Sequence, residues 1–255
     1  MKETGIGKGA IMTPLWLHAL SILAILSGLA SALLIVADEW RDPQHMAIMN
    51  AVWPLTALFA GPLALMFYFS HGKDAAKSRM ASHESSGEGH HSHPKSSTPV
   101  AVSKACAHCG SGCALGDMIA EWLAFFFPVV ALWFGWQSVF AEKIFAIWVL
   151  DFVLAFGFGI AFQYFTIKPM RGLTPLKGLV AALKADALSL TAWQVGMYGF
   201  MGFAHFWLFP RVVGTELRVP SVEFWFMMQI AMLAGFVTAW PMNWWLIRAG
   251  IKERM

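Results

Sequence analysis

The chain has 255 residues, of which 58% are hydrophobic and only 13% charged, and its mean hydropathy is +0.58. The charged share is about half that of an ordinary soluble domain, which excludes a disordered chain, a coiled coil and most soluble folds. A net charge of +3 does not indicate a nucleic-acid partner, because the basic residues follow a membrane pattern. We therefore expect an α-helical integral membrane protein whose main partner is the lipid bilayer.

Six apolar stretches are each long enough to cross a hydrocarbon core of about 30 Å. They cover residues 14–37, 46–70, 118–141, 144–167, 187–210 and 222–247. None shows the alternation of a transmembrane β-strand, and lipid leaves helices as the remaining way to satisfy the backbone. The sequence predicts an all-α, polytopic bundle of six transmembrane helices.

The basic residues predict the orientation of these spans. Fourteen of the 18 Lys and Arg residues fall in the N-terminal tail, the second and fourth loops and the C-terminal end. Positive residues accumulate on the cytoplasmic side of a membrane. Both termini are therefore expected in the cytoplasm, and the chain is expected to be a multi-pass protein of a bacterial inner membrane.

Three units are expected along the chain. Residues 1–70 would form a two-helix membrane hairpin, residues 71–105 a disordered His-rich cytoplasmic loop, and residues 106–255 a cysteine motif followed by a four-helix unit. In the fourth loop, Thr174 can cap a helix that starts at Pro175. That helix is expected to lie along the cytoplasmic surface of the membrane.

Several strings in the chain resemble a known family. They are WPLTALFAGP at 53–62, HCGSGCALGD at 108–117, FQYF at 162–165 with PMRGL at 169–173, LKAD at 183–186 with WQVGMY at 193–198, and NWWLI at 243–247. Together they are similar to a bacterial membrane-protein family catalogued only as a domain of unknown function. The resemblance covers residue 53 to the end, apart from the His-rich loop. It implies a membrane fold and no functional residue.

All three cysteines lie in one motif, CxHCxxxC, formed by Cys106, His108, Cys109 and Cys113. The thiols suit a soft ion such as Cu(I), or Zn(II) or an iron–sulfur centre, with His108 or Asp117 as a fourth ligand. The two glycines of the motif would let the backbone fold the thiols toward one point. Redox chemistry of the thiols, or reduced thiols without a ligand, are the alternatives.

Histidines in the preceding loop form a second candidate site. His90, His91 and His93 stand close together in a polar tract, and such tracts often bind metal. They would collect an ion loosely before thiolates hold it, unless the tract is only a soluble linker.

The predicted outer half of the bundle carries a third group. Met197, Met201 and His205 are spaced i, i+4 and i+8, so they share one helix face and form a ladder of soft ligands. Methionine also packs well in cores, and the two histidines predicted on the outer side, His45 and His205, would suit haem. Asp151 is an intramembrane carboxylate at a depth similar to that of His205, where the two could pair or relay protons, or Asp151 could simply bond between helices.

These features favour a membrane protein that binds and transports a soft metal ion, with Cu(I) preferred to Zn(II). Partners would be a cytoplasmic metallochaperone and a second copy of the chain. The alternatives are a membrane redox protein using haem or thiols, and a sensor or assembly factor that does not transport. No nucleotide-binding or hydrolase motif occurs, so a non-enzymatic role is favoured.

Overall fold

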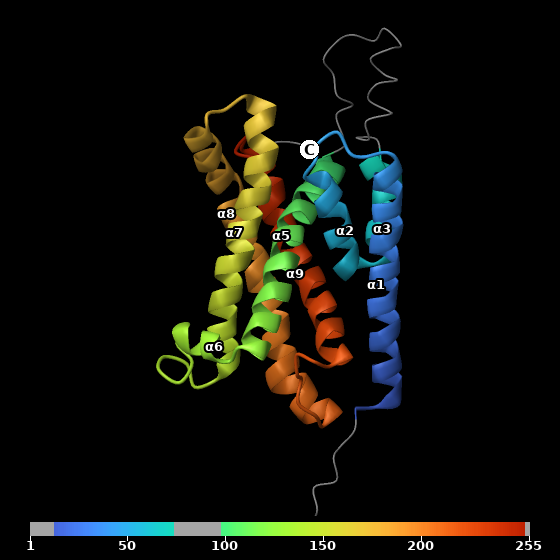
Figure 1. The fold of residues 1–255 in the computed structure, drawn as a ribbon, viewed down its shortest axis with the longest axis vertical. Helices are drawn as coiled ribbons and strands as arrows, with labels where there is room; N and C mark the ends of the chain where they lie inside the picture. The colour runs from blue at the N-terminus through green and yellow to red at the C-terminus, as the bar shows by residue number, and fades with distance from the viewer. Residues whose placement is uncertain (1–12, 74–97, 253–255) are drawn as a thin grey trace, which may run out of the picture.

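The computed structural model describes residues 13–73 and 98–252, and within these ranges the chain is helical and contains no β-strand (Figure 1). The α-helices are α1 (Leu15–Arg41), α2 (Met49–Ala60), α3 (Pro62–Phe67), α5 (Thr98–Phe126), α6 (Val129–Trp133), α7 (Lys143–Arg171), α8 (Pro175–Phe203) and α9 (Val222–Arg248). Two π-helical segments, η1 (Tyr68–Gly72) and η3 (Ala204–Val213), extend α3 and α8. The all-α prediction is confirmed for the described residues.

Five helices, α1, α5, α7, α8 and α9, run the length of the bundle. Each has 27 to 29 residues and is therefore about 40 Å long. Three segments are long and apolar enough to cross a membrane: α1, Lys143–Lys168 of α7, and α9. The helices α5 and α8 have the same length but carry polar residues, and α5 is the most buried of the five.

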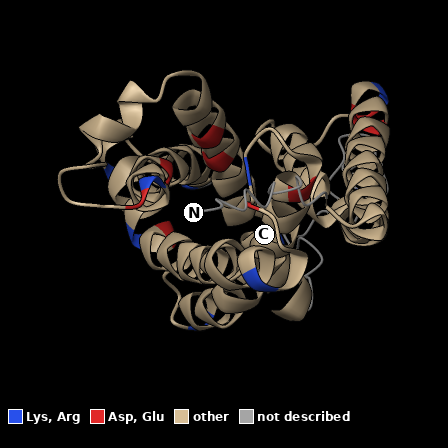
Figure 2. Ribbon diagram, turned by 90° about the horizontal axis from the view of Figure 1, so that it is seen from below, with Lys and Arg blue, Asp and Glu red and all other residues tan. Residues whose placement is uncertain are grey.

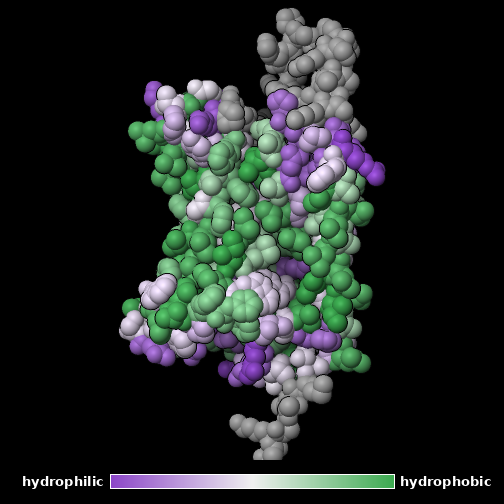
Figure 3. Space-filling view, viewed as in Figure 1, coloured by the Kyte–Doolittle hydropathy of each residue, from purple (hydrophilic) through white to green (hydrophobic). Residues whose placement is uncertain are grey.

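The surface agrees with a membrane environment. Seen along the bundle, charged residues are sparse on the helices (Figure 2). A broad apolar band separates polar ends of the molecule (Figure 3). Large hydrophobic side chains such as Leu23 and Leu33 of α1 are two-thirds exposed. Such side chains would be costly in water, and they match the hydrocarbon of a bilayer.

The predicted second span, residues 46–70, is a hairpin of two short helices. The helix α2 ends at Gly61, whose φ of +53° favours glycine, and Pro62 begins α3. The tip packs on the middle of α1, where a Cβ on Gly28 would lie 2.5 Å from the carbonyl oxygen of Leu58. Because Gly28 is halfway along α1, the hairpin reaches only half the length of the bundle.

After the tip, the chain returns to the end of α1 from which α2 started. The Tyr68 hydroxyl donates to Asp38 at 2.8 Å, and Lys73 Nζ pairs with the same carboxylate at 2.6 Å. The prediction of a spanning helix here is therefore wrong. The length of the apolar run predicts one helix, but its Gly61-Pro62 pair reverses the chain.

The two ends of the described chain lie at opposite ends of the bundle. His18 Nδ1, near the start of α1, is 2.6 Å from Oε1 of Glu223 at the start of α9, so α1 and α9 run parallel. The end of α9 is consequently far from the start of α1 (Figure 1). The described chain therefore does not place its two ends at the same end of the bundle, as the sequence predicted.

The third predicted span is also displaced. The helix is Thr98–Phe126 rather than 118–141, so it begins inside the predicted 71–105 loop and ends just before Pro128. Its first half is rich in small residues because α5 lies very close to α7. A Cβ on Gly112 would lie 2.7 Å from the backbone of Gly159, and one on Gly116 would meet the backbone of Ala155. Gly112 and Gly116 thus permit close helix packing, Gly110 leaves room for the Trp193 ring, and none of the three bends the helix.

The surface helix predicted at Pro175 is not a separate element. It is the first part of α8, which continues without a break to Phe203. Thr174 does occupy the N-cap position, but its side chain makes no capping hydrogen bond.

Candidate functional site

One face of α5 carries a continuous row of buried polar side chains. Cys106, Cys109, Cys113, Asp117 and Glu121 follow one another at intervals of three or four residues, so they share this face. Their exposed fractions lie between 0% and 4%. The row, called the α5 stripe below, extends about 22 Å along the helix. A polar row of this length inside an apolar bundle is a functional candidate.

At the end of the bundle where Lys252 lies, the α5 stripe meets a buried ion pair. Lys252 Nζ is 2.5 Å from Oδ1 of Asp186 on α8, and both side chains are fully buried. Lys252 Nζ also donates to Cys109 Sγ at 3.1 Å. The Cys109 thiol lies 3.0 Å from Asp186 Oδ1 and 2.7 Å from Ser189 Oγ. A cation, a carboxylate and a thiol therefore share one enclosed position.

Asn243 of α9 completes this group. Its Oδ1 accepts from Lys252 at 2.8 Å and from Ser189 at 3.2 Å, and its Nδ2 donates to Cys106 Sγ at 3.3 Å. The Lys252 ammonium thus uses all three of its donors, on Asp186, Cys109 and Asn243. We call Cys106, Cys109, Asp186, Ser189, Asn243 and Lys252 the thiol cluster.

The end of α9 explains how a lysine reaches the interior. Gly250 adopts a φ of +70°, and the backbone N–H groups of Ile251 and Lys252 both donate to the Leu246 carbonyl. This glycine cap turns the chain back over the helix end. Burial alone would lower the pKa of Lys252, but the Asp186 carboxylate and its hydrogen bonds raise that pKa above its ordinary value. Lys252 therefore carries its charge inside the bundle.

Lower on the α5 stripe, carboxyl groups gather. The Asp117 carboxyl lies within hydrogen-bonding reach of the Asp151 carboxyl on α7, and the Tyr198 hydroxyl of α8 lies beside Asp151. The Tyr198 hydroxyl donates to the Trp148 carbonyl at 2.9 Å. By distance and angle neither oxygen of Asp117 makes a hydrogen bond within the described part of the chain, although the Gln194 amide of α8 lies near this carboxyl. The two carboxyl groups therefore form a second buried polar group, one helical turn from Cys113.

One family model matches the chain, that of a domain of unknown function (DUF4396), over residues 100–252. The chain belongs to the DUF4396 family. The matched region spans α5 to α9 and includes the whole thiol cluster and the carboxyl groups below it. The predicted membership of a family of unknown function is confirmed for this region. No curated protein and no solved structure matches the chain.

Within the DUF4396 region, the structure separates His108 from the cysteines. Its ring faces α7, where Nε2 lies 2.9 Å from Thr166 Oγ1 and the ring packs edge-on against Phe162. Adjacent helical residues point about 100° apart, which explains the separation. In the described ranges, no group of three His, Cys, Asp or Glu side chains is placed to hold a metal ion. His90, His91 and His93 lie outside the described residues.

The predicted methionine ladder is partly assembled. Met197 and Met201 are buried in α8, in the same core cluster as the three cysteines, whereas His205 is only half-buried in η3. Asp151 lies beside Asp117 and Tyr198. The predicted pairing of Asp151 with His205 is not seen in the described part of the chain. His45 follows α1 and His205 follows α8, so these histidines lie at opposite ends of the bundle.

Four members of the thiol cluster are not predicted by the sequence: Asp186, Ser189, Asn243 and Lys252. Asn243 is one of two amides in the apolar run of α9, with Gln229, and this is the available signal. Asp186 and Lys252 sit at the margins of apolar runs and looked like ordinary interfacial charges. Their pairing depends on α8 and α9 lying side by side, which the sequence does not state.

Proposed function

We propose that this DUF4396 protein carries a soft metal ion across a membrane along the α5 stripe, with Cu(I) favoured and Zn(II) as the alternative. The observation that carries the proposal is the stripe itself, in which three thiols lead to two carboxyl groups with no break in burial. Thiolates prefer soft ions, and carboxylates accept charge and protons. Burying a row of polar side chains in an apolar bundle costs stability. A function that binds or conducts a polar species would explain why the row is there.

The charge distribution supports an orientation. Nine of the twelve described Lys and Arg residues lie toward the end of the bundle that holds Lys252 and the open ends of the hairpin. By the positive-inside rule, that end would face the cytoplasm of a bacterial inner membrane. The chain would cross the bilayer five times, with α2 and α3 as a re-entrant hairpin. The thiol cluster would then exchange its ion with a cytoplasmic metallochaperone.

A labelling experiment tests this topology. Single cysteines at Thr13 and Ser221 should react with a membrane-impermeant maleimide from the periplasmic side. A cysteine at the exposed Ala249, which leaves the glycine cap at Gly250 intact, should react only after the membrane is opened. The native cysteines are fully buried and serve as an unreactive background. Labelling of Thr13→Cys and Ala249→Cys from the same side would contradict the five-crossing topology.

Lys252 gives the thiol cluster a way to open and close. Its ammonium fills the position between Cys109, Asp186 and Asn243 that a metal ion would take. An incoming ion must displace the ammonium, and each thiol that binds the ion must release its proton. Asp151 of α7, which lies beside Asp117 one to two turns further along the α5 stripe, can accept such a proton.

Transport in liposomes tests the function. Reconstituted protein should move Cu(I) into vesicles that contain a Cu(I) chelator, and Cys109→Ser should reduce the initial rate by about tenfold or more, because a thiolate ligand is lost. The matched control is Ser111→Ala, which changes a buried side chain two residues away, off the α5 stripe. Equal rates for Cys109→Ser and Ser111→Ala would contradict the proposal.

A sensor is the second candidate, and the position of Lys252 in the turn directly after α9 favours it. An ion that displaces Lys252 would free the segment that follows α9, and a cytoplasmic partner could detect this change. A sensor would bind the ion through the thiol cluster without moving it into vesicles. The transport experiment therefore separates the two candidates.

A further inference from the structure

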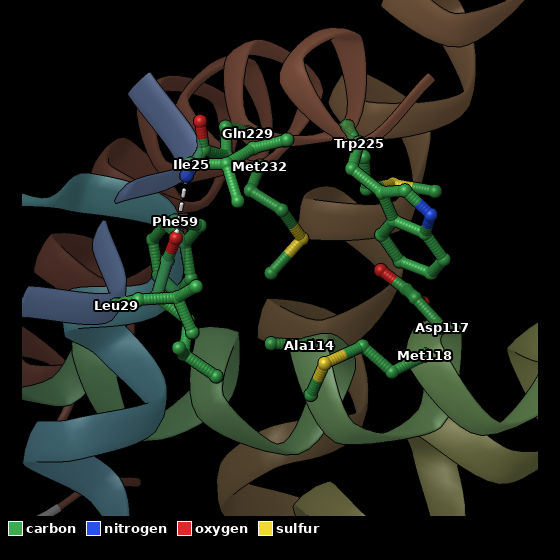
Figure 4. Close-up of a pocket in the computed structure, with 11 residues that line it drawn as sticks. Ile25, Leu29, Phe59, Ala114, Asp117, Met118, Trp225, Gln229 and Met232 are labelled. Carbon is green, nitrogen blue, oxygen red and sulfur yellow. Dashed lines mark hydrogen bonds between the residues drawn. The ribbon is translucent and has the colours of Figure 1, made fainter. Parts of the chain in front are cut away.

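A cavity lies directly below the tip of the α2–α3 hairpin. It has a volume of about 160 Å³ and lies between α1, the end of α2, α5 and α9 (Figure 4). The half-length hairpin is the reason for this space, because no helix of the hairpin continues beside the other half of α1. The lining is mostly aliphatic and aromatic, with Phe59 of the tip and Trp225 of α9 on its walls.

Two kinds of side chain in this lining are unusual together. The first is Asp117, which is 1% exposed, points a carboxyl oxygen into the cavity and receives no hydrogen bond there from a described residue. The second is a set of three methionines, Met118, Met228 and Met232. Figure 4 shows the thioethers of Met118 and Met232 directed into the space.

From this lining we infer a second binding site, for a soft monovalent metal ion, formed by Asp117, Met118, Met228 and Met232. Thioethers are soft, neutral ligands that hold Cu(I) in preference to harder ions. The Asp117 carboxylate supplies the single negative charge that neutralises a monovalent cation. Met228 and Met232 are one helical turn apart on α9, so both side chains reach the same space.

Other cations fit this lining poorly. An alkylammonium group carries donors that need several acceptors, and the lining offers one carboxylate. The one amide in the wall, that of Gln229, already donates to the Leu58 carbonyl at 2.7 Å. Hard ions such as Mg²⁺ or Ca²⁺ require six or more oxygen ligands, which this lining does not supply.

The inference rests on the proposed function in taking the same ion as its cargo. Asp117 belongs both to the α5 stripe and to the cavity. It lies eight residues beyond Cys109, about 12 Å along the helix. The cavity site would therefore hold the ion in the middle of the bundle, after it leaves the thiols and before it reaches the far side.

Silver(I) is the probe, because it is soft, monovalent and redox-inert. In the full-length chain with all three cysteines replaced by serine, we expect one bound Ag(I) per chain by isothermal titration. Met228→Leu in this background should weaken binding about tenfold or more, since one ligand of the ion is removed. Met227→Leu is the control, because Met227 is also buried in α9 but does not line the cavity. Leucine replaces methionine with little change in volume, so the fold should persist.

The same comparison in the native-cysteine chain guards against misfolding of the thiol-free variant. There, Met228→Leu with Met232→Leu should lower the stoichiometry by one Ag(I) relative to Met227→Leu. Equal binding by these variants, or no Ag(I) bound by a folded thiol-free chain, would overturn the cavity site. The proposed function would survive that result if Cys109 still supports Cu(I) transport, and it would fail separately if transport is absent.

Discussion

Replacement of Lys252 by methionine is expected to lower the free energy of unfolding by about 3–5 kcal/mol, because it leaves the Asp186 carboxylate buried without its cation. The same change should strengthen Cu(I) binding by about tenfold or more. A positive charge 3.1 Å from the Cys109 sulfur opposes an incoming cation, and methionine removes it. Stability and metal affinity should thus change in opposite directions. Unfolding in mixed micelles and competition with a Cu(I) chelator measure the two effects.

The control for this prediction is a double variant. Lys252→Met combined with Asp186→Asn removes both charges and should recover most of the lost stability, since no unpaired charge is left buried. The double variant should not show the higher Cu(I) affinity expected of Lys252→Met alone, because the Asp186 carboxylate is also gone. A Lys252→Met protein that is destabilised and binds Cu(I) more weakly than the native chain would refute the role assigned to Lys252.

The second large effect is expected from the thiols. With Cys106, Cys109 and Cys113 all replaced by serine, the affinity of the thiol cluster for Cu(I) should fall by more than about 100-fold, because serine hydroxyls are hard, weak ligands for a soft ion. The measurement is a competition titration with a Cu(I) chelator on the purified protein. Stability should change little, since serine nearly matches cysteine in size and can keep hydrogen bonds to Asn243, Ser189 and Asp186.

His108→Gln is the informative comparison for the thiols. His108 belongs to the same sequence motif but faces Thr166 on the other side of α5. Its replacement should leave Cu(I) affinity within about twofold, because the side chain does not contact the thiol cluster. An equal loss of affinity in the His108 variant and the triple cysteine variant would mean that the motif acts in another arrangement of α5.

The length of the apolar runs predicts helix boundaries well for helices whose surface is apolar and exposed. The boundaries of α1, α7 and α9 follow the predicted runs closely, because these helices expose large apolar side chains. It failed for α5, which is surrounded by other helices. A central helix needs small residues for close packing and tolerates polar ones, so its first half looked like a loop. The hairpin was missed for the opposite reason, since both of its short helices are apolar.

The candidate site followed a similar pattern. Spacing alone could place Cys106, Cys109, Cys113 and Asp117 near one another, and they do share a face of α5. Contacts between distant segments could not be read in this way. The pairing of Lys252 with Asp186 joins residues 66 positions apart, and it exists only because a glycine cap turns the chain end back into the bundle.

The half-length hairpin and α1 belong to the part of the chain that the family model does not cover. The matched region, residues 100–252, supplies the α5 stripe, the thiol cluster and two walls of the cavity. The remaining walls come from α1 and the hairpin tip, which precede that region. Without α1 and the hairpin, the cavity beside Asp117 would lose the walls formed by Ile25, Leu29, Leu58 and Phe59. The N-terminal helices therefore shield the buried Asp117 carboxyl from the surroundings of the bundle, and a charge at this depth depends on them.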